Sequence, residues 1–207
     1  LWFGGSSDKA IDVAAKHVET YLSWGETPDQ IGAKVDLVKA RAEKLGRELE
    51  YGIRLYVIVR DTDEEAWAAA ADLYGRMDEA AIAANQRFVG KTDSVGQQRM
   101  TAMHGGQKPE NLRDLEIAPN LWAGIGLVRP GPGTAIVGSP DTVIRTLEAY
   151  KKAGVNTFIL SGMPLLEEAF RFGEKVLPRL DVSREVSVAK QFTWSTLFDR
   201  DLSAKAS

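Results

Sequence analysis

The protein has 207 residues, of which 44% are hydrophobic and 27% are charged, as in an ordinary globular protein. The net charge of -3 argues against a nucleic-acid-binding surface, which is usually basic. The chain has no cysteine and only two histidines, which excludes thiol chemistry and argues against a multi-histidine metal site. We therefore expect no metal, no nucleic-acid partner and no membrane span, and the lack of a signal peptide favours the cytoplasm.

The first predicted element is a short strand at residues 1–3 (LWF), which leads into the turn sequence GGSS at residues 4–7. A free terminus is usually polar, so we interpret this start as lying inside a strand whose preceding gene segment is missing. Ser7 is placed to cap a helix over about residues 8–18. A short strand at 20–24 follows, and Thr27 then opens a capping box that predicts a helix from Pro28 to about residue 45.

The clearest strand is YGIRLYVIVR at residues 51–60, which is rich in β-branched residues. Thr62 repeats the capping signature before an alanine-rich helix predicted to run to about residue 84. Residues 85–120 are polar and lack a sustained period, which is typical of a functional or mobile segment. The remaining predictions are a short helix at 95–103, extended chain at 121–128, a loop at 129–134, a helix at 139–154, a strand at 156–161 and a helix at 164–177.

Four strand–helix units with one long insertion predict an α/β fold with a parallel sheet. An open four-stranded sheet would leave two exposed edges, whereas a closed barrel needs four more units and about 250 residues. We therefore expect strands 5–8 of a (β/α)8 TIM barrel over residues 1–180, with a lid-like insertion at 85–120 and a tail at 181–207 without a clear period. A complete, small, doubly wound fold is the alternative.

Two turns at strand ends could bind a ligand. The glycines of the 4–7 turn let a backbone approach a ligand, and the following helix start with two hydroxyls suits a phosphate; a tight turn with a serine cap is the plainer interpretation. Trp24 closes the strand 20–24, at the end where barrel active sites lie. Its indole could line a flat ring system or simply pack the barrel rim.

Two arginines could bind an anion. Strand alternation places Arg54 and Tyr56 toward the barrel interior and the intervening apolar residues under the helices. A buried guanidinium needs an anionic partner, so Arg54 is either in a structural ion pair or an anion-binding group. Arg60, near the strand end, is expected to face solvent. Arg129 lies on a Gly/Pro-rich loop and could clamp an anion or remain solvated.

Five segments together resemble the C-terminal half of the alkanesulfonate monooxygenases, which are bacterial-luciferase-like flavin monooxygenases. They are YLSWGETP, GIRLYVIVRDTDEEAW, TDSVGQQRM, NLWAGIGLVRPGPGTAIVG and GVNTFILSGMPLLEEAF, in that order, and the resemblance covers about residues 1–180. It implies a TIM barrel with a mobile lid at 85–120. It also implies that the full protein forms dimers or tetramers. It also implies that reduced FMN from a separate flavin reductase reacts with O2 and cleaves the C–S bond of an alkanesulfonate, releasing sulfite and an aldehyde.

The resemblance also implies roles for particular residues. Gly5, Ser6 and Ser7 would contact the flavin phosphate, and Trp24 would line the active site. Arg54 and Arg129 would hold the sulfonate or stabilise negative charge on the flavin–oxygen adduct, a task for which guanidinium groups are suited.

Three positions depart from the family pattern: Tyr56, Met163 and Leu165 stand where His, Tyr and His are usual. The Tyr56 phenol can donate a hydrogen bond but cannot accept a proton near neutral pH as imidazole can, so we keep it as a candidate catalytic residue with an altered role. From these three departures we infer a divergent paralogue, with another organosulfur substrate or with weakened activity. A relative that uses the deazaflavin coenzyme F420 and an inactive half-barrel remnant are the alternatives, and the half-barrel alone is expected to be inactive.

Overall fold

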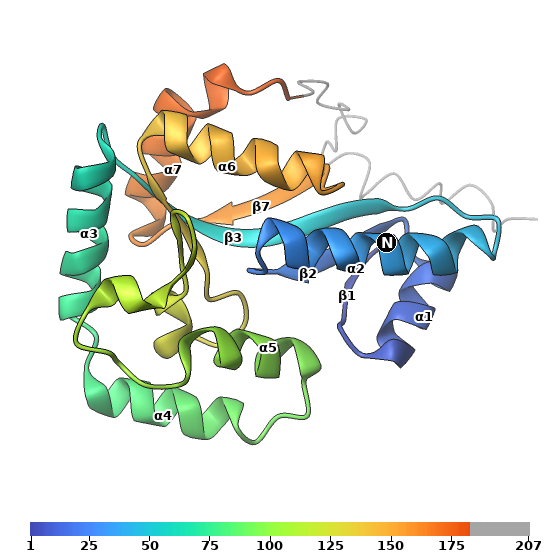
Figure 1. The fold of residues 1–207 in the computed structure, drawn as a ribbon, viewed down its shortest axis with the longest axis horizontal. Helices are drawn as coiled ribbons and strands as arrows, with labels where there is room; N and C mark the ends of the chain where they lie inside the picture. The colour runs from blue at the N-terminus through green and yellow to red at the C-terminus, as the bar shows by residue number, and fades with distance from the viewer. Residues whose placement is uncertain (183–207) are drawn as a thin grey trace, which may run out of the picture.

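The computed structural model describes residues 1–182, so nearly all of the predicted tail at 181–207 lies outside the described residues. No helix in this part is long and apolar enough to cross a membrane. The helices and strands, seen in Figure 1, are β1 (Trp2–Gly4), α1 (Asp8–His17), β2 (Thr20–Trp24), α2 (Pro28–Glu43), β3 (Glu50–Val59), α3 (Asp63–Gly75), α4 (Glu79–Val89), α5 (Val95–His104), β4 (Glu116–Ala118), β5 (Leu121–Trp122), β6 (Ala135–Gly138), α6 (Pro140–Lys152), β7 (Thr157–Ser161) and α7 (Leu165–Lys175).

Four parallel strands form the centre of the sheet in the order β1-β2-β3-β7. Arg54 of β3 pairs with Trp24 of β2 and with Ile159 of β7, so these two strands flank β3 on opposite edges. β6 pairs in parallel with residues 56–59 and so continues along β3 beyond the end of β2. The strands curl into half of a TIM barrel, which confirms the predicted fold class.

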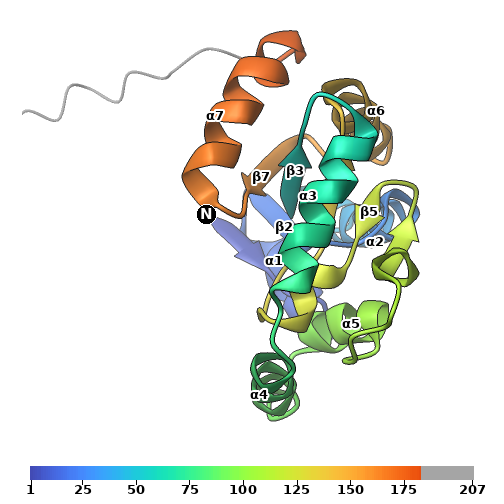
Figure 2. The ribbon, with the colours of Figure 1, turned by 90° about the vertical axis from the view of Figure 1, so that its left-hand side faces the viewer.

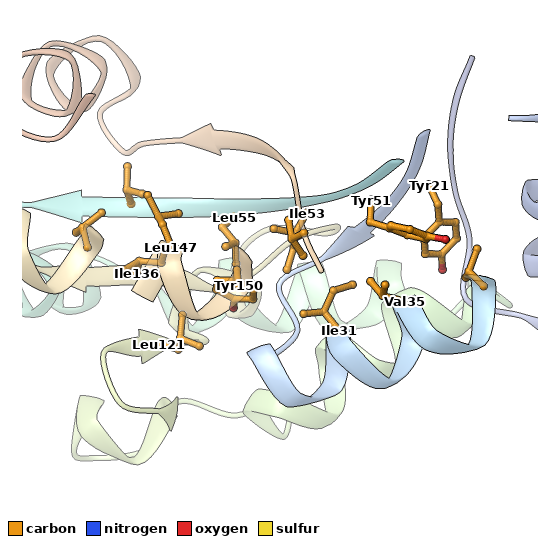
Figure 3. Packing of buried hydrophobic residues seen from close by; sticks show 14 of the residues in the cluster. Tyr21, Ile31, Val35, Tyr51, Ile53, Leu55, Leu121, Ile136, Leu147 and Tyr150 are labelled. Atoms are coloured by element: carbon orange, nitrogen blue, oxygen red, sulfur yellow. The ribbon is translucent and has the colours of Figure 1, made fainter. Parts of the chain in front are cut away.

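The two faces of β3 are covered differently. Ile53, Leu55, Val57 and Val59 lie in one apolar cluster with residues of α1, α2 and α6, which confirms the predicted helix-covered face. Figure 3 shows part of this packing, with Ile53 and Leu55 among side chains of α2 and α6. The opposite face carries Trp24, Arg54 and Tyr56, and its far end is covered by α3 and residues 112–128. Figure 2 looks onto this end, where α3 stands in front of β3.

The predicted helix starts are confirmed by their caps. The Ser7 hydroxyl accepts a hydrogen bond from the Ala10 amide at 3.2 Å. In the capping box, the Thr27 amide donates to Gln30 Oε1 at 3.0 Å, and the Gln30 amide donates to Thr27 Oγ1 at 3.4 Å. These bonds satisfy amides that have no partner within the helix, and so they fix where each helix begins.

The prediction of one helix to about residue 84 is wrong, because α3 ends at Gly75 and α4 begins at Glu79. The alanine pattern continues through this break and therefore concealed it. Met77 within the break is buried in a second apolar cluster, which includes Tyr56, Trp67, Tyr74 and Trp122. The burial of Met77 turns the chain away from the axis of α3. Tertiary packing thus overrides the local preference for helix.

The extended segment predicted at 121–128 is also wrong beyond Trp122. Residues 124–127 form a 3-10 helix, whose Gly126 amide donates to the Gly133 carbonyl at 3.1 Å. This contact folds the Gly/Pro loop back on itself. In this part of the chain the strand that pairs with β3 is β6, a four-residue element that the sequence pattern did not reveal because it directly follows the loop.

Gly5→Ala is expected to lower the free energy of unfolding by about 1–3 kcal/mol, the usual cost of overpacking. A Cβ at Gly5 would lie 2.5 Å from Ala10 Cβ, so the turn or α1 must shift. Urea denaturation measures the change. Gly173→Ala is the control, since that helical position has open space and the substitution should stabilise by roughly 0.5–1 kcal/mol. Equal effects of the two substitutions would contradict this prediction.

Candidate functional site

A cavity of about 180 Å³ opens beside the turn that follows β1. Its wall combines the turn residues 4–7 with Trp24, Lys34 and the segment 93–96 at the start of α5. A Cβ on Gly96 would lie 3.6 Å from the Trp24 ring and 3.7 Å from Ser6 Oγ. The first turn of α5, which belongs to the predicted insertion, therefore lies directly over Ser6 and Trp24.

Two side chains from other elements hold the turn at residues 4–7 in place by hydrogen bonds. The Tyr21 hydroxyl donates to the Gly5 carbonyl at 2.6 Å. Burial raises the pKa of Tyr21 far above its ordinary value, so this hydroxyl keeps its proton. Ser6 accepts a hydrogen bond from the Lys34 ammonium at 3.1 Å. The predicted residues Gly5, Ser6 and Ser7 thus line one cavity with Trp24, in a turn that is held by two other elements.

A buried ion pair between Lys34 and Glu26 lines the inner side of the cavity, with side-chain exposures of 5% and 4%. Ser23 donates to Glu26 and accepts from Lys34 at 3.0 Å. Arg99 of α5 donates to Glu26 Oε1 at 3.1 Å, so one carboxylate serves two cations. Burial lowers the pKa of Lys34, and the charge of Glu26 partly opposes this shift.

Lys34 and Arg99 were not predicted as site residues, although the sequence contains a signal for the first. Lys34 interrupts the apolar stripe of α2 between Ile31, Val35 and Val38, all of which are buried. A cation on a buried helix face needs a partner, and the pattern alone does not reveal which one.

Arg54 and Tyr56 lie on the face of β3 that is not covered by α1, α2 and α6, and the exposed Arg129 approaches Tyr56 from the Gly/Pro loop. Buried Arg54 Nε and Tyr56 Oη have no hydrogen-bond partner within residues 1–182. The Arg129 guanidinium carbon lies 5.6 Å from the centre of the Tyr56 ring, within the range of a cation–π contact. Because Arg54 is the register partner of Trp24, the two side chains project from the same face of the sheet. Orphaned buried donors in native proteins call for a functional explanation.

The loop that carries Arg129 is attached to α5. Gln97, which is 6% exposed, accepts a hydrogen bond from the Gly131 amide at 2.8 Å. Gly126 and Gly133 approach so closely that a Cβ on Gly133 would lie 2.5 Å from Gly126 Cα. Arg129 and the cavity wall formed by α5 therefore belong to one connected segment.

Comparison with known proteins identifies the family. A model of the luciferase-like monooxygenases matches residues 1–157. The chain belongs to this family. Solved structures agree at the level of the fold, with TM-scores of 0.63 for a riboflavin lyase, 0.64 for DmoA from Hyphomicrobium sulfonivorans and 0.62 for the long-chain alkane monooxygenase LadA.

The sequence identities of these three structures to the chain are 20%, 21% and 21%. The matched regions cover 87%, 86% and 86% of this chain but only 42%, 40% and 40% of the chains in those structures. The luciferase-like chain described here thus spans about two fifths of the length of its structural neighbours.

Two expectations for this luciferase-like chain need correction. Arg60 does not simply face solvent, because it pairs with Glu168, whose side chain is 1% exposed. Glu168 also accepts from the Val59 amide at 3.0 Å and from Arg171 at 3.2 Å, and so attaches α7 to β3. Leu165, one of the three departures from the family pattern, is exposed and does not line the cavity beside the turn at 4–7. Met163 packs against the second apolar cluster, which contains Tyr56.

His104 at the end of α5 gives a pH prediction. It is 6% exposed, its Nε2 has no partner within residues 1–182, and burial lowers its pKa. The unfolded chain therefore binds a proton more readily, so the free energy of unfolding should fall as the pH is lowered from about 7 to 5. Urea denaturation should show a flatter pH dependence for His104→Gln. His17→Gln, at an exposed site on α1, should keep the wild-type slope, and equal slopes in all three proteins would contradict the prediction.

Proposed function

We propose that this protein is a reduced-flavin-dependent monooxygenase that uses O2 to cleave the C–S bond of an alkanesulfonate, giving sulfite and an aldehyde. Membership of the luciferase-like family supports the reaction class. The observation that carries the substrate class is Arg54 Nε, which has no hydrogen-bond partner within residues 1–182, on the same strand face as Tyr56, whose ring the Arg129 guanidinium approaches. Two guanidinium groups around a buried phenol suit a sulfonate, which keeps its negative charge at any physiological pH.

The residues beside the cavity fit FMN. The turn at 4–7 presents backbone and hydroxyl groups at the start of α1, which is a favourable place for a phosphate. Trp24 offers a flat wall between this turn and Arg54, where a ring system extending from the phosphate would lie. The riboflavin lyase among the structural neighbours was crystallised with modified FMN and riboflavin. Reduced FMN would supply the activated oxygen.

The side chains of the chain would then hold and shield the substrate. Arg54 and Arg129 bind the sulfonate oxygens, and their charge also stabilises negative charge that develops during C–S cleavage. Tyr56 donates a hydrogen bond from its hydroxyl, which has no acceptor in the described residues. α5 covers Ser6 and Trp24 and excludes water from that side. A separate flavin reductase would deliver the cofactor, and the protein would act as a homo-oligomer.

The test is sulfite formation by the full-length protein, from a series of 1-alkanesulfonates in the presence of O2, FMN, NADH and a flavin reductase, because the half-barrel alone is expected to be inactive. We expect sulfite and the matching aldehyde in equal amounts, and none when the protein or the reductase is omitted. No sulfite from any chain length would overturn the sulfonate assignment. A parallel titration with FMN and coenzyme F420 tests the cofactor, and binding of F420 alone would overturn the flavin assignment.

A further inference from the structure

The ion pair that lines the cavity carries an excess of positive charge. Within residues 1–182, Glu26 is the only carboxylate that pairs with Lys34 or Arg99, and it contacts both. One anion between two cations leaves a net charge of about +1 beside the turn. The exposed Asp93 also lines the cavity, but lies at its open side before α5. A second anion brought to Ser6 would therefore complete the charge balance of a buried cluster.

Lys34 is directed at the turn and not only at Glu26. Its ammonium has three protons and contacts Ser6 Oγ at 3.1 Å, Ser23 Oγ at 3.0 Å and the Glu26 carboxylate. Ser6 lines the cavity, and Lys34 itself forms part of the wall. An oxyanion that replaced the Ser6 hydroxyl, or shared it, would meet a charged donor that is already desolvated.

We propose that Lys34 is the cationic ligand for a phosphate monoester bound at the Gly5–Ser6–Ser7 turn, and that the Glu26–Arg99 ion pair couples this phosphate to the position of α5. The first part names the residue that selects the phosphorylated flavin, and so it rests on the proposed function. A phosphate monoester carries a charge of about -1.5 to -2 near neutral pH, which exceeds what hydroxyl and amide donors neutralise.

The coupling to α5 follows from the shared carboxylate. Arg99 is half-exposed on α5, and its only carboxylate partner within residues 1–182 is Glu26. When the Lys34 ammonium also interacts with a phosphate, its interaction with Glu26 becomes weaker. The Glu26 carboxylate can then interact more strongly with Arg99. The ion pair between Glu26 and Arg99 is strengthened, and α5 is held more firmly over Ser6 and Trp24.

The first experiment compares FMN with riboflavin, which has the same ring but no phosphate, by quenching of flavin fluorescence. Lys34→Met should weaken FMN binding by about 10- to 100-fold and leave riboflavin binding nearly unchanged, because a charged hydrogen bond is lost only for FMN. Lys39→Met is the matched control, since Lys39 is exposed on the same helix. It should keep the wild-type preference for FMN.

A second variant keeps the test valid if Lys34→Met folds poorly. Lys34→Met/Glu26→Gln removes both members of the buried pair and leaves no buried charge without a partner, since Arg99 is half-exposed, yet it should also lose the preference for FMN. Retention of the wild-type preference in a folded variant would overturn the role of Lys34. The proposed function would survive that result, because FMN would still bind.

Calorimetry with inorganic phosphate tests the role of Lys34 separately from the proposed FMN cofactor. Phosphate binding that depends on Lys34, in a protein that does not bind FMN, would support the inference and overturn the proposed cofactor. Phosphate binding that is equal in wild type and Lys34→Met would overturn the inference.

Hydrogen exchange tests the coupling to α5. FMN should slow exchange of the α5 amides more than riboflavin does at equal occupancy, and this difference should disappear in Arg99→Gln. If FMN and riboflavin differ by the same amount in Arg99→Gln as in wild type, the coupling to α5 is overturned. The role of Lys34 is tested separately by the binding experiment.

Discussion

In the full-length protein, Arg54→Ala is expected to lower the rate of sulfite formation by about 100- to 1,000-fold, the usual cost of losing one preorganised electrostatic donor in an active site. Arg54 Nε is buried and has no partner within residues 1–182, so its free energy of solvation is not recovered by any bond in the described fold. The same substitution should therefore leave the protein equally stable or slightly more stable. A large loss of activity without a loss of stability separates a catalytic arginine from a structural one.

Two variants control this result. Arg54→Lys keeps the charge but not the planar fork, and it should recover only part of the activity. Arg76→Ala removes an exposed arginine that pairs with Asp72 at the end of α3, and should change neither rate nor stability. Rates are measured with saturating flavin and a reductase in excess. An Arg54→Ala protein that unfolds, or that keeps the wild-type rate, would contradict the catalytic role.

The main strands and helix starts were predictable because local chemistry decides them. The alternation of β3 assigned Ile53 and Leu55 to the helix-covered face, and the structure confirms this. The caps at Ser7, Thr27 and Thr62 each form the expected hydrogen bond to a helix amide. Each of these features depends on residues no more than four positions apart, which a pattern in one sequence can reveal.

The errors concern contacts between distant residues. The end of α3 depends on where Met77 is buried, and the bend after Trp122 depends on the contact between Gly126 and Gly133. Arg60 looked like a strand-end residue facing solvent, because its partner Glu168 lies 108 positions further along the chain. Neither hydrophobic periodicity nor turn composition contains information about such pairs.

The same limit applies to the candidate site. The sequence singled out Ser6, Trp24 and Arg54, because strand ends and an arginine in an apolar strand are local signals. It did not reveal that α5 covers the first two, nor that Lys34 and Arg99 meet at Glu26. The roles of the predicted residues in flavin and sulfonate binding remain predictions, and the variants above test them individually.

Glu26→Ala is expected to lower the free energy of unfolding by about 3–5 kcal/mol at pH 7, the usual cost of removing one partner of a buried ion pair. Lys34 would keep only hydroxyl partners in a site where its side chain is 5% exposed, whereas the half-exposed Arg99 can turn toward water. Urea denaturation measures the loss. Glu43→Ala, at an exposed carboxylate near Lys39, should change stability by less than about 0.5 kcal/mol.

The pH dependence identifies Lys34 as the cause of this loss. Burial already lowers the pKa of Lys34, and the charge of Glu26 is the main influence that raises it. In Glu26→Ala the pKa of Lys34 should fall further below that of the unfolded chain, which then binds more protons than the folded protein. Stability of the variant should therefore rise with pH between about 7 and 9 more steeply than that of wild type. Lys34→Met/Glu26→Gln should remove the extra slope and recover most of the lost stability, since it leaves no buried charge without a partner. If the double variant is as unstable as Glu26→Ala, the loss comes from packing around Glu26 and not from the charge of Lys34.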